Sequence, residues 1–140
     1  MRTYLKTLSF TLAIILIASM TLAQDVLVDV TKTYSNISKI EVEGGWLEVK
    51  YEGTSSSEVS VEAFLKSNVA DQDIIFVTVG DVLKISYSRK KNNYSWNNKN
   101  DGRIHITGPC KMGIDFKNSS GSIDVEKVSG DQTSIQVTSG

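Results

Sequence analysis

The sequence predicts an all-β protein in which N-terminal antiparallel strands lead into a short β-solenoid. Three observations support this prediction: apolar residues alternate with polar ones along most of the chain, glycine-containing turn signals separate these stretches, and glycines recur at a fixed spacing near the C-terminus. Alternation with a period of two is typical of a strand with one buried face, whereas an amphipathic helix repeats every 3.6 residues. We therefore divide the chain into segment 1–23, a β region 24–88, a polar loop 89–101 and a repeat region 102–140.

The first 23 residues have the layout of a secretory signal peptide. Arg2 and Lys6 precede the apolar run LSFTLAIILIASM, and the predicted cut follows Ala23. A transmembrane span needs roughly 20 predominantly apolar residues, and this run is shorter. We expect an exported protein that resides in the periplasm, on the cell surface or outside the cell, with no stable membrane span after cleavage.

The charge balance narrows the classes of molecule that the protein is expected to bind. The chain has 15 Lys and Arg against 16 Asp and Glu, and residues 1–23 contain two of the positive charges and none of the negative ones. The mature chain is thus mildly acidic, which argues against nucleic acid as a partner because phosphate binding needs a basic face.

Cys110 has no second cysteine with which to form an internal disulfide. We expect it to be an inert turn or core residue, with a reactive thiol or an intermolecular bridge as alternatives.

The region 24–88 is a series of alternating stretches. In order, they are DVLVDV, ISKIEVE, WLEVKYE, EVSVEAF, IIFVTV and LKISYS. Hairpin signals separate them at Gly44-Gly45, in the GTSSS run of 53–57 and at Gly80-Asp81. The stretch IIFVTV is apolar on both faces, so we predict that it is the most buried strand of the group.

The polar loop 89–101 lies in the stretch RKKNNYSWNNKNDG, which is rich in Asn and Lys and lacks apolar alternation. Such a composition predicts a long exposed loop or a linker between two parts of the chain. Aromatic faces can stack on sugars and cations can hold acidic glycans, so the loop is a candidate binding tip. Its candidate residues are Arg89, Lys90, Lys91, Tyr94 and Trp96. A loop that is merely solvated is the competing interpretation.

The repeat region is marked by glycines at a spacing of 19 residues, namely Gly102, Gly121 and Gly140. The apolar pair Ile104 and Ile106 recurs at the same offset, and a second apolar pair recurs at an offset of 21. Two short strands and two glycine corners would make one solenoid coil of about 20 residues. A pair of hairpins in a sandwich is the alternative. Because the last glycine resembles the start of a further unit, we expect a truncated solenoid or one whose end is covered by the N-terminal strands or a partner.

His105, the only histidine, occupies the same place in the first unit as Asp124 in the second. Stacked coils would set the two side chains about 4.8 Å apart on an exposed ladder. We predict a surface ladder pair, with a catalytic dyad as the disfavoured alternative. The sequence contains no complete phosphate loop and no calcium loop. No catalytic residue, metal or cofactor is therefore predicted.

The repeat region and its flanks resemble a known family. The segments IHITGP, IDFKNSSGSIDVEKVSGD and SIQVTSG are similar to the bacterial adhesin-like β-strand-repeat proteins, the auto-transporter adhesins allied to the head GIN domain. The resemblance covers roughly residues 36–140. It implies an exported surface or periplasmic protein with introductory strands and a solenoid, and it supplies no catalytic residues. The very polar loop and the presence of barely two coils depart from the family's pattern.

These features predict a non-enzymatic, adhesin-like interaction module whose partner is a glycan or a cell-surface protein. A polysaccharide-active β-helix enzyme is the first alternative, but it would need acidic and basic side chains gathered on several stacked coils. A structural or assembly protein that self-associates through the exposed end of its solenoid is the second.

Overall fold

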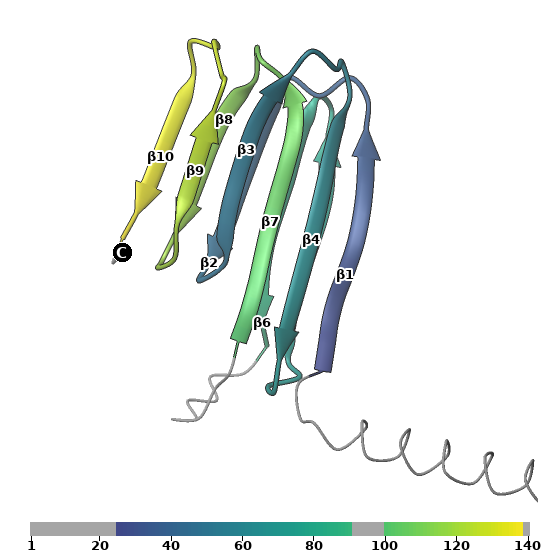
Figure 1. Ribbon diagram of the computed structural model, residues 1–140, viewed down its shortest axis with the longest axis vertical. Coiled ribbons are helices and arrows are strands. Elements are labelled where there is room, and N and C mark those ends of the chain that lie inside the picture. The colour runs from purple at the N-terminus through teal and green to yellow at the C-terminus, as the bar shows by residue number, and fades with distance from the viewer. Residues whose placement is uncertain (1–24, 91–99, 139–140) are drawn as a thin grey trace, which may run out of the picture.

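The computed structural model describes residues 25–90 and 100–138, and this part of the chain contains ten β-strands and no helix (Figure 1). Sheet A has the spatial order β1 (Asp25–Tyr34), β4 (Val59–Ser67), β7 (Asn100–Pro109), β3 (Glu48–Thr54) and β9 (Ile123–Glu126). Sheet B has the order β10 (Thr133–Val137), β8 (Gly113–Asn118), β2 (Lys39–Gly45), β6 (Val82–Arg89) and β5 (Gln72–Val79). The all-β prediction is confirmed, whereas the predicted signal peptide lies outside the described residues. Within the described ranges, no helix is long and apolar enough to cross a membrane.

Both sheets are mixed, which corrects the expected antiparallel arrangement of the region 24–88. In sheet A, β1, β4 and β7 are antiparallel neighbours, whereas β7, β3 and β9 run parallel. In sheet B, β6, β2, β8 and β10 run parallel, and β5 is antiparallel to β6. Parallel neighbours need a crossover connection. The chain meets this need by passing from one sheet to the other between β2 and β3 and between β8 and β9.

One of the three predicted hairpins is confirmed. The strands β5 and β6 pair up to Val79 and Val82, and the two-residue turn between them has Gly80 at φ 61°. The Gly44-Gly45 signal instead turns the chain from sheet B into sheet A, because β2 and β3 belong to different sheets. The GTSSS run leads from β3 to β4, which β7 separates within sheet A.

The predicted β region 24–88 and repeat region 102–140 share one core rather than forming successive units. In sheet A, β7 lies between β4 and β3, and in sheet B, β8 lies beside β2. Both regions therefore contribute fully buried side chains. Among the largest are Ile40, Leu47, Tyr51, Leu65, Leu83, Ile85, Ile104, Ile106, Ile114 and Phe116.

The strand β5 is not the most buried strand, contrary to the prediction from IIFVTV. It is an edge strand of sheet B, and its outward-facing Ile75, Val77 and Val79 are 42%, 47% and 58% exposed. Only its other face, with the buried Ile74 and the partly buried Phe76, packs against the core. An apolar run on both faces therefore did not mean burial on both faces here.

The parallel pair of β8 and β10 in sheet B has a register of 19 residues. The strands β8 and β10 pair with Phe116 beside Ile135, and 135 − 116 = 19. This register replaces the offset of 21 expected for the second apolar pair. In sheet A the expected stacking of β7 directly on β9 is wrong, because β3 lies between them.

The predicted corner glycines have different roles. Gly121 precedes β9 with φ 86°, a conformation that glycine adopts without a steric cost. Gly102 is not at a corner but within β7, where a Cβ atom would lie 2.3 Å from Cδ2 of Leu47. Gly140 lies outside the described residues. The repeat spacing thus identified one corner and one site of close packing.

Candidate functional site

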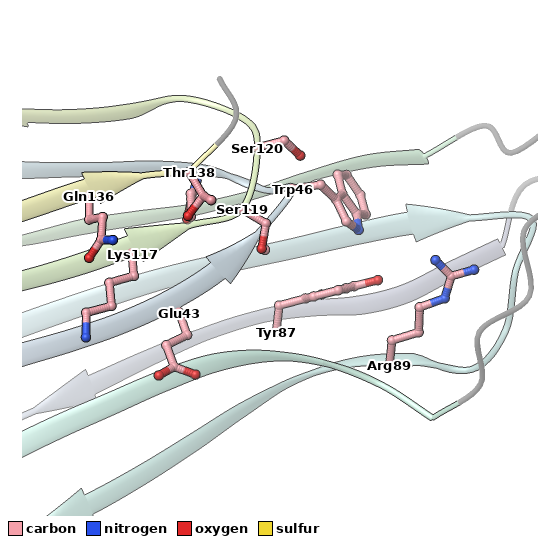
Figure 2. A pocket seen from close by; sticks show the side chains of 11 residues that line it. Glu43, Trp46, Tyr87, Arg89, Lys117, Ser119, Ser120, Gln136 and Thr138 are labelled. Carbon is pink, nitrogen blue, oxygen red and sulfur yellow. The ribbon is translucent and has the colours of Figure 1, made fainter.

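A cavity of about 530 Å³ opens where β2 ends and the chain turns into β3 (Figure 2). We call it the end pocket. Its principal lining residues are Glu43, Trp46, Tyr87, Arg89, Lys117 and Gln136. They come from β2, β6, β8, β10 and the β2–β3 turn, so the pocket exists only because these strands are neighbours in sheet B.

Two aromatic rings form the apolar wall of the end pocket. The ring centroids of Trp46 and Tyr87 are 5.8 Å apart with an interplanar angle of 76°, an edge-to-face contact. The hydroxyl of Tyr87 donates to Oε1 of Gln72 at 2.6 Å, which holds the phenol ring in place. Gly45 has φ 60°, and a Cβ there would lie 2.6 Å from Cδ1 of Tyr87. Glycine at this position therefore lets the ring pack against the backbone.

The turn that carries Trp46 is held by the connection from β8 to β9. The side-chain Nδ2 of Asn118, which is only 3% exposed, donates to the carbonyl of Leu47 at 2.8 Å. The backbone N–H groups of Ser119 and Ser120 both donate to the carbonyl of Gly45, at 3.0 and 3.1 Å. These bonds tie the indole to a second segment of the fold and pre-organise the pocket wall.

The rim of the end pocket carries charges of both signs. Glu43 on β2 lies beside Lys117 on β8 in the parallel ladder, and Arg89 stands at the end of β6. Gln136 adds amide donors and an acceptor from β10. An apolar ring surface surrounded by cations and hydrogen-bonding groups suits a ligand with an apolar face and polar edges, as a sugar has.

Of the two candidate loop residues that the structure describes, Arg89 lines the end pocket and Lys90 does not. Lys90 is exposed, and its backbone N–H donates to the carbonyl of Asp71 at 3.0 Å. Lys91, Tyr94 and Trp96 lie outside the described residues. The sequence reasoning missed Trp46 and Tyr87, because each belongs to a stretch with ordinary strand alternation. Only the pairing of β2 with β6 brings them together.

His105 and Asp124 face the same surface of sheet A, but they are not the neighbouring pair that was predicted. Both are in register with Lys50 on β3, which lies between them. The Nε2 atom of His105 lies 3.4 Å from Oε1 of Glu48 instead. Both side chains of this pair are substantially exposed, so the contact is worth less than about 1 kcal/mol.

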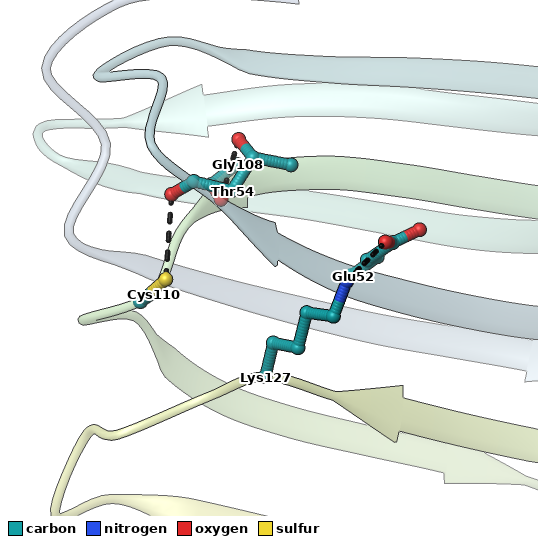
Figure 3. Close-up of polar contacts among 5 residues, drawn as sticks. All are labelled: Glu52, Thr54, Gly108, Cys110 and Lys127. Atoms are coloured by element: carbon teal, nitrogen blue, oxygen red, sulfur yellow. Dashed lines mark hydrogen bonds and ion pairs between the residues drawn. The ribbon is translucent and has the colours of Figure 1, made fainter.

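Cys110 lies in the connection from β7 to β8, within a group of polar contacts (Figure 3). Its thiol Sγ is 3.4 Å from the carbonyl oxygen of Thr54, whose Oγ1 donates to the carbonyl of Gly108 at 3.3 Å. Nearby, Nζ of Lys127 is 3.2 Å from Oε1 of Glu52. Within residues 25–90 and 100–138, no group of three or more His, Cys, Asp or Glu side chains could hold a metal ion.

Tyr51 on β3 is fully buried in the core. Its hydroxyl donates to the carbonyl of Pro109 at 2.6 Å. Burial, and secondly the charge of Cys110, raise the pKa of Tyr51 to about 12. The phenol therefore stays protonated at physiological pH and serves as a buried hydrogen-bond donor.

No family model and no curated protein matches the chain. Among solved structures, the chain is similar to "a putative cell adhesion protein" from Clostridium sporogenes, with a TM-score of 0.50 and 13% sequence identity. The similarity covers 79% of this chain and 57% of that one, so the chain spans little more than half the length of its structural neighbour. At this identity the likeness is one of fold alone, and the resemblance to the adhesin-like repeat family remains a prediction.

Proposed function

We propose that the protein is an exported, non-enzymatic, adhesin-like interaction module that acts in the periplasm or at the cell surface. The end pocket carries this proposal, because it sets two aromatic rings beside cations and hydrogen-bonding groups at the end of sheet B where β2 turns into β3. A glycan is the ligand class that these groups suit best. The similarity in fold to a protein named for cell adhesion is consistent with this role.

We also infer that β2–β3, β8–β9 and β10 are successive coils of a short β-solenoid. The parallel ladders β2–β8–β10 and β3–β9 support this inference. Core-facing side chains stack across the coils, as Val42, Phe116 and Ile135 do in sheet B. Stacked coils would present the pocket residues on a stiff frame.

Replacing Trp46 by Ala is expected to weaken glycan binding at least about tenfold, because an aromatic anchor in a pocket typically dominates binding energy. Binding is measured first on an array of immobilised neutral and acidic glycans and then by surface plasmon resonance on those retained. Circular dichroism establishes that each variant is folded at the assay temperature.

Trp96→Ala is the matched control, since it removes the same side chain from the predicted binding loop. Unchanged binding by this variant would support the end pocket as the site. Loss of binding by Trp96→Ala with retention by Trp46→Ala would assign the site to the loop instead. Failure of the unmodified protein to bind any glycan would refute the glycan proposal.

Export is expected to release a mature chain that begins at Gln24. Intact-mass spectrometry of the protein from the periplasmic and culture fractions of a bacterial host measures the cut directly. The variant Ala23→Trp should remain uncut, because cleavage needs a small residue before the scissile bond. If the protein without the Ala23→Trp substitution stays uncut in the cytoplasm of the host, the result contradicts export.

A further inference from the structure

The large apolar side chains that are exposed in the described part of the chain all lie on edge strands. They are Val26 and Val30 on β1, Ile75, Val77 and Val79 on β5, and Ile135 and Val137 on β10. The three on β5 point outward. In contrast, Val30, Ile135 and Val137 face the core side of their sheets. An uncovered core-facing surface marks a place where another segment can pack.

The strand β10 continues the core-facing row of sheet B past the end of sheet A. Ile135 and Val137 lie beside Phe116 and Asn118 in the parallel ladder. Phe116 and Asn118 are 0% and 3% exposed, whereas Ile135 and Val137 are 48% and 39% exposed. Sheet A ends at β9, and β10 lies beyond it at the side of the molecule (Figure 1). Among the described residues, no strand of sheet A therefore lies opposite β10.

The strand β1 has the complementary overhang at the other side of the molecule. Val30 is paired with Ala63 in the antiparallel ladder, and residues so paired face the same side of the sheet. Ala63 is 2% exposed but Val30 is 38% exposed. The cover over β1 comes from β5, where Nζ of Lys32 lies 4.5 Å from the ring centroid of Phe76. In the described part of the chain sheet B ends at β5, so the uncovered place beneath β1 lies in sheet B.

We propose that copies of this chain associate head to tail, with β10 of one copy pairing with β5 of the next copy beneath its β1. In such a stack β10 and β5 meet as antiparallel neighbours, because β10 runs parallel to β6 and β5 runs antiparallel to β6. The core-facing row of β10 then covers Val30, and sheet B becomes continuous.

The joining edges favour a second copy as the occupant. The strand β10 has no charged residue, and β5 has only Asp73, so no like charges face each other between these two strands. The ladder between β5 and β6 is unbroken over eight residues, and β5 has no bulge or proline of the kind that commonly protects an edge. Two copies could instead meet through a two-fold contact between their β10 strands. In that arrangement no strand of sheet A would cover Ile135 of either copy, and both side chains would face the same gap. A head-to-tail contact uses two different surfaces, so a dimer still has one free surface of each kind and the association continues past the dimer.

The test is complementation between two variants. The mass of the associated species is measured by sedimentation velocity over a wide range of protein concentrations, with the full chain as it is purified after expression. The unmodified protein should gain mass beyond a dimer as its concentration rises. Ile135→Lys blocks the β10 end and Val30→Lys blocks the β1 end, and each alone should associate at least about tenfold more weakly, because a Lys in an apolar contact is desolvated. A mixture of the two should form dimers and stop there, since each variant keeps the end that the other has lost.

Ser134→Lys is the matched control, because it puts the same side chain on the outward face of β10 beside Asp115. It should associate as the unmodified protein does, and thermal melting of each variant verifies that it is folded. Association of Val30→Lys alone would indicate a two-fold β10 contact and overturn the proposal. An unmodified protein that is monomeric at every concentration, or variants that do not complement each other, would overturn it as well.

Discussion

Replacing Phe116 by Ala is expected to lower the free energy of unfolding by about 3–5 kcal/mol. The ring is fully buried beside Val42 in sheet B and makes an edge-to-face contact with Tyr51 of sheet A, with centroids 6.5 Å apart. Its removal leaves a cavity between two sheets whose backbones are fixed by their ladders, so the site cannot collapse fully. Urea denaturation followed by circular dichroism measures the change.

Val77→Ala is the control for this prediction, because it truncates an apolar side chain that is 47% exposed on an edge strand. The free energy of unfolding should change by no more than about 0.5 kcal/mol. A loss comparable to that of Phe116→Ala would mean that β5 is buried on both faces, as its composition had suggested, and would contradict the edge position.

Between pH 10 and about 12, Tyr51 is expected to account for a loss of about 2–3 kcal/mol of folding stability. Burial, and after it the charge of Cys110, raise the pKa of Tyr51 from 10.0 to about 12. In this window the unfolded chain releases the phenol proton while the folded chain keeps it, so rising pH favours unfolding. Below pH 10 both states hold the proton, and the contribution of Tyr51 is fully present.

Urea unfolding at a series of pH values up to about 12 measures this loss, and Tyr51→Phe is its reference. The variant leaves the carbonyl of Pro109 without its phenol donor, so it should be less stable by about 1–3 kcal/mol at neutral pH. It should also lose the Tyr51 part of the alkaline slope while it keeps that of Tyr34, whose pKa is raised by burial as well. Identical slopes in the two proteins would show that Tyr51 does not titrate as described.

The candidate site was only partly accessible to sequence reasoning. Arg89 was found because a change in composition marks the polar loop that begins there. Trp46 and Tyr87 were missed, because their stretches have the alternation of ordinary strands, and their contact depends on the pairing of β2 with β6. Likewise, His105 and Asp124 do occupy equivalent register positions, but the insertion of β3 places Lys50 between them.

The sequence by itself determined the all-β class, the position of most strands and the tight turn at Gly80-Asp81. These features depend on the two-residue period of a strand and on the backbone freedom of glycine, and both act over a few residues. The offset of 21 expected for the second apolar pair was wrong, because the ladder sets Phe116 rather than Ile114 beside Ile135.

Only the tertiary structure decided the order of the strands, and with it the shared core, the edge position of β5 and the end pocket. Many strands of this chain have the same alternation and could pair with one another equally well. The choice among them depends on which arrangement buries side chains such as Tyr51 and Phe116 together, and that burial is a property of the whole core rather than of any one segment.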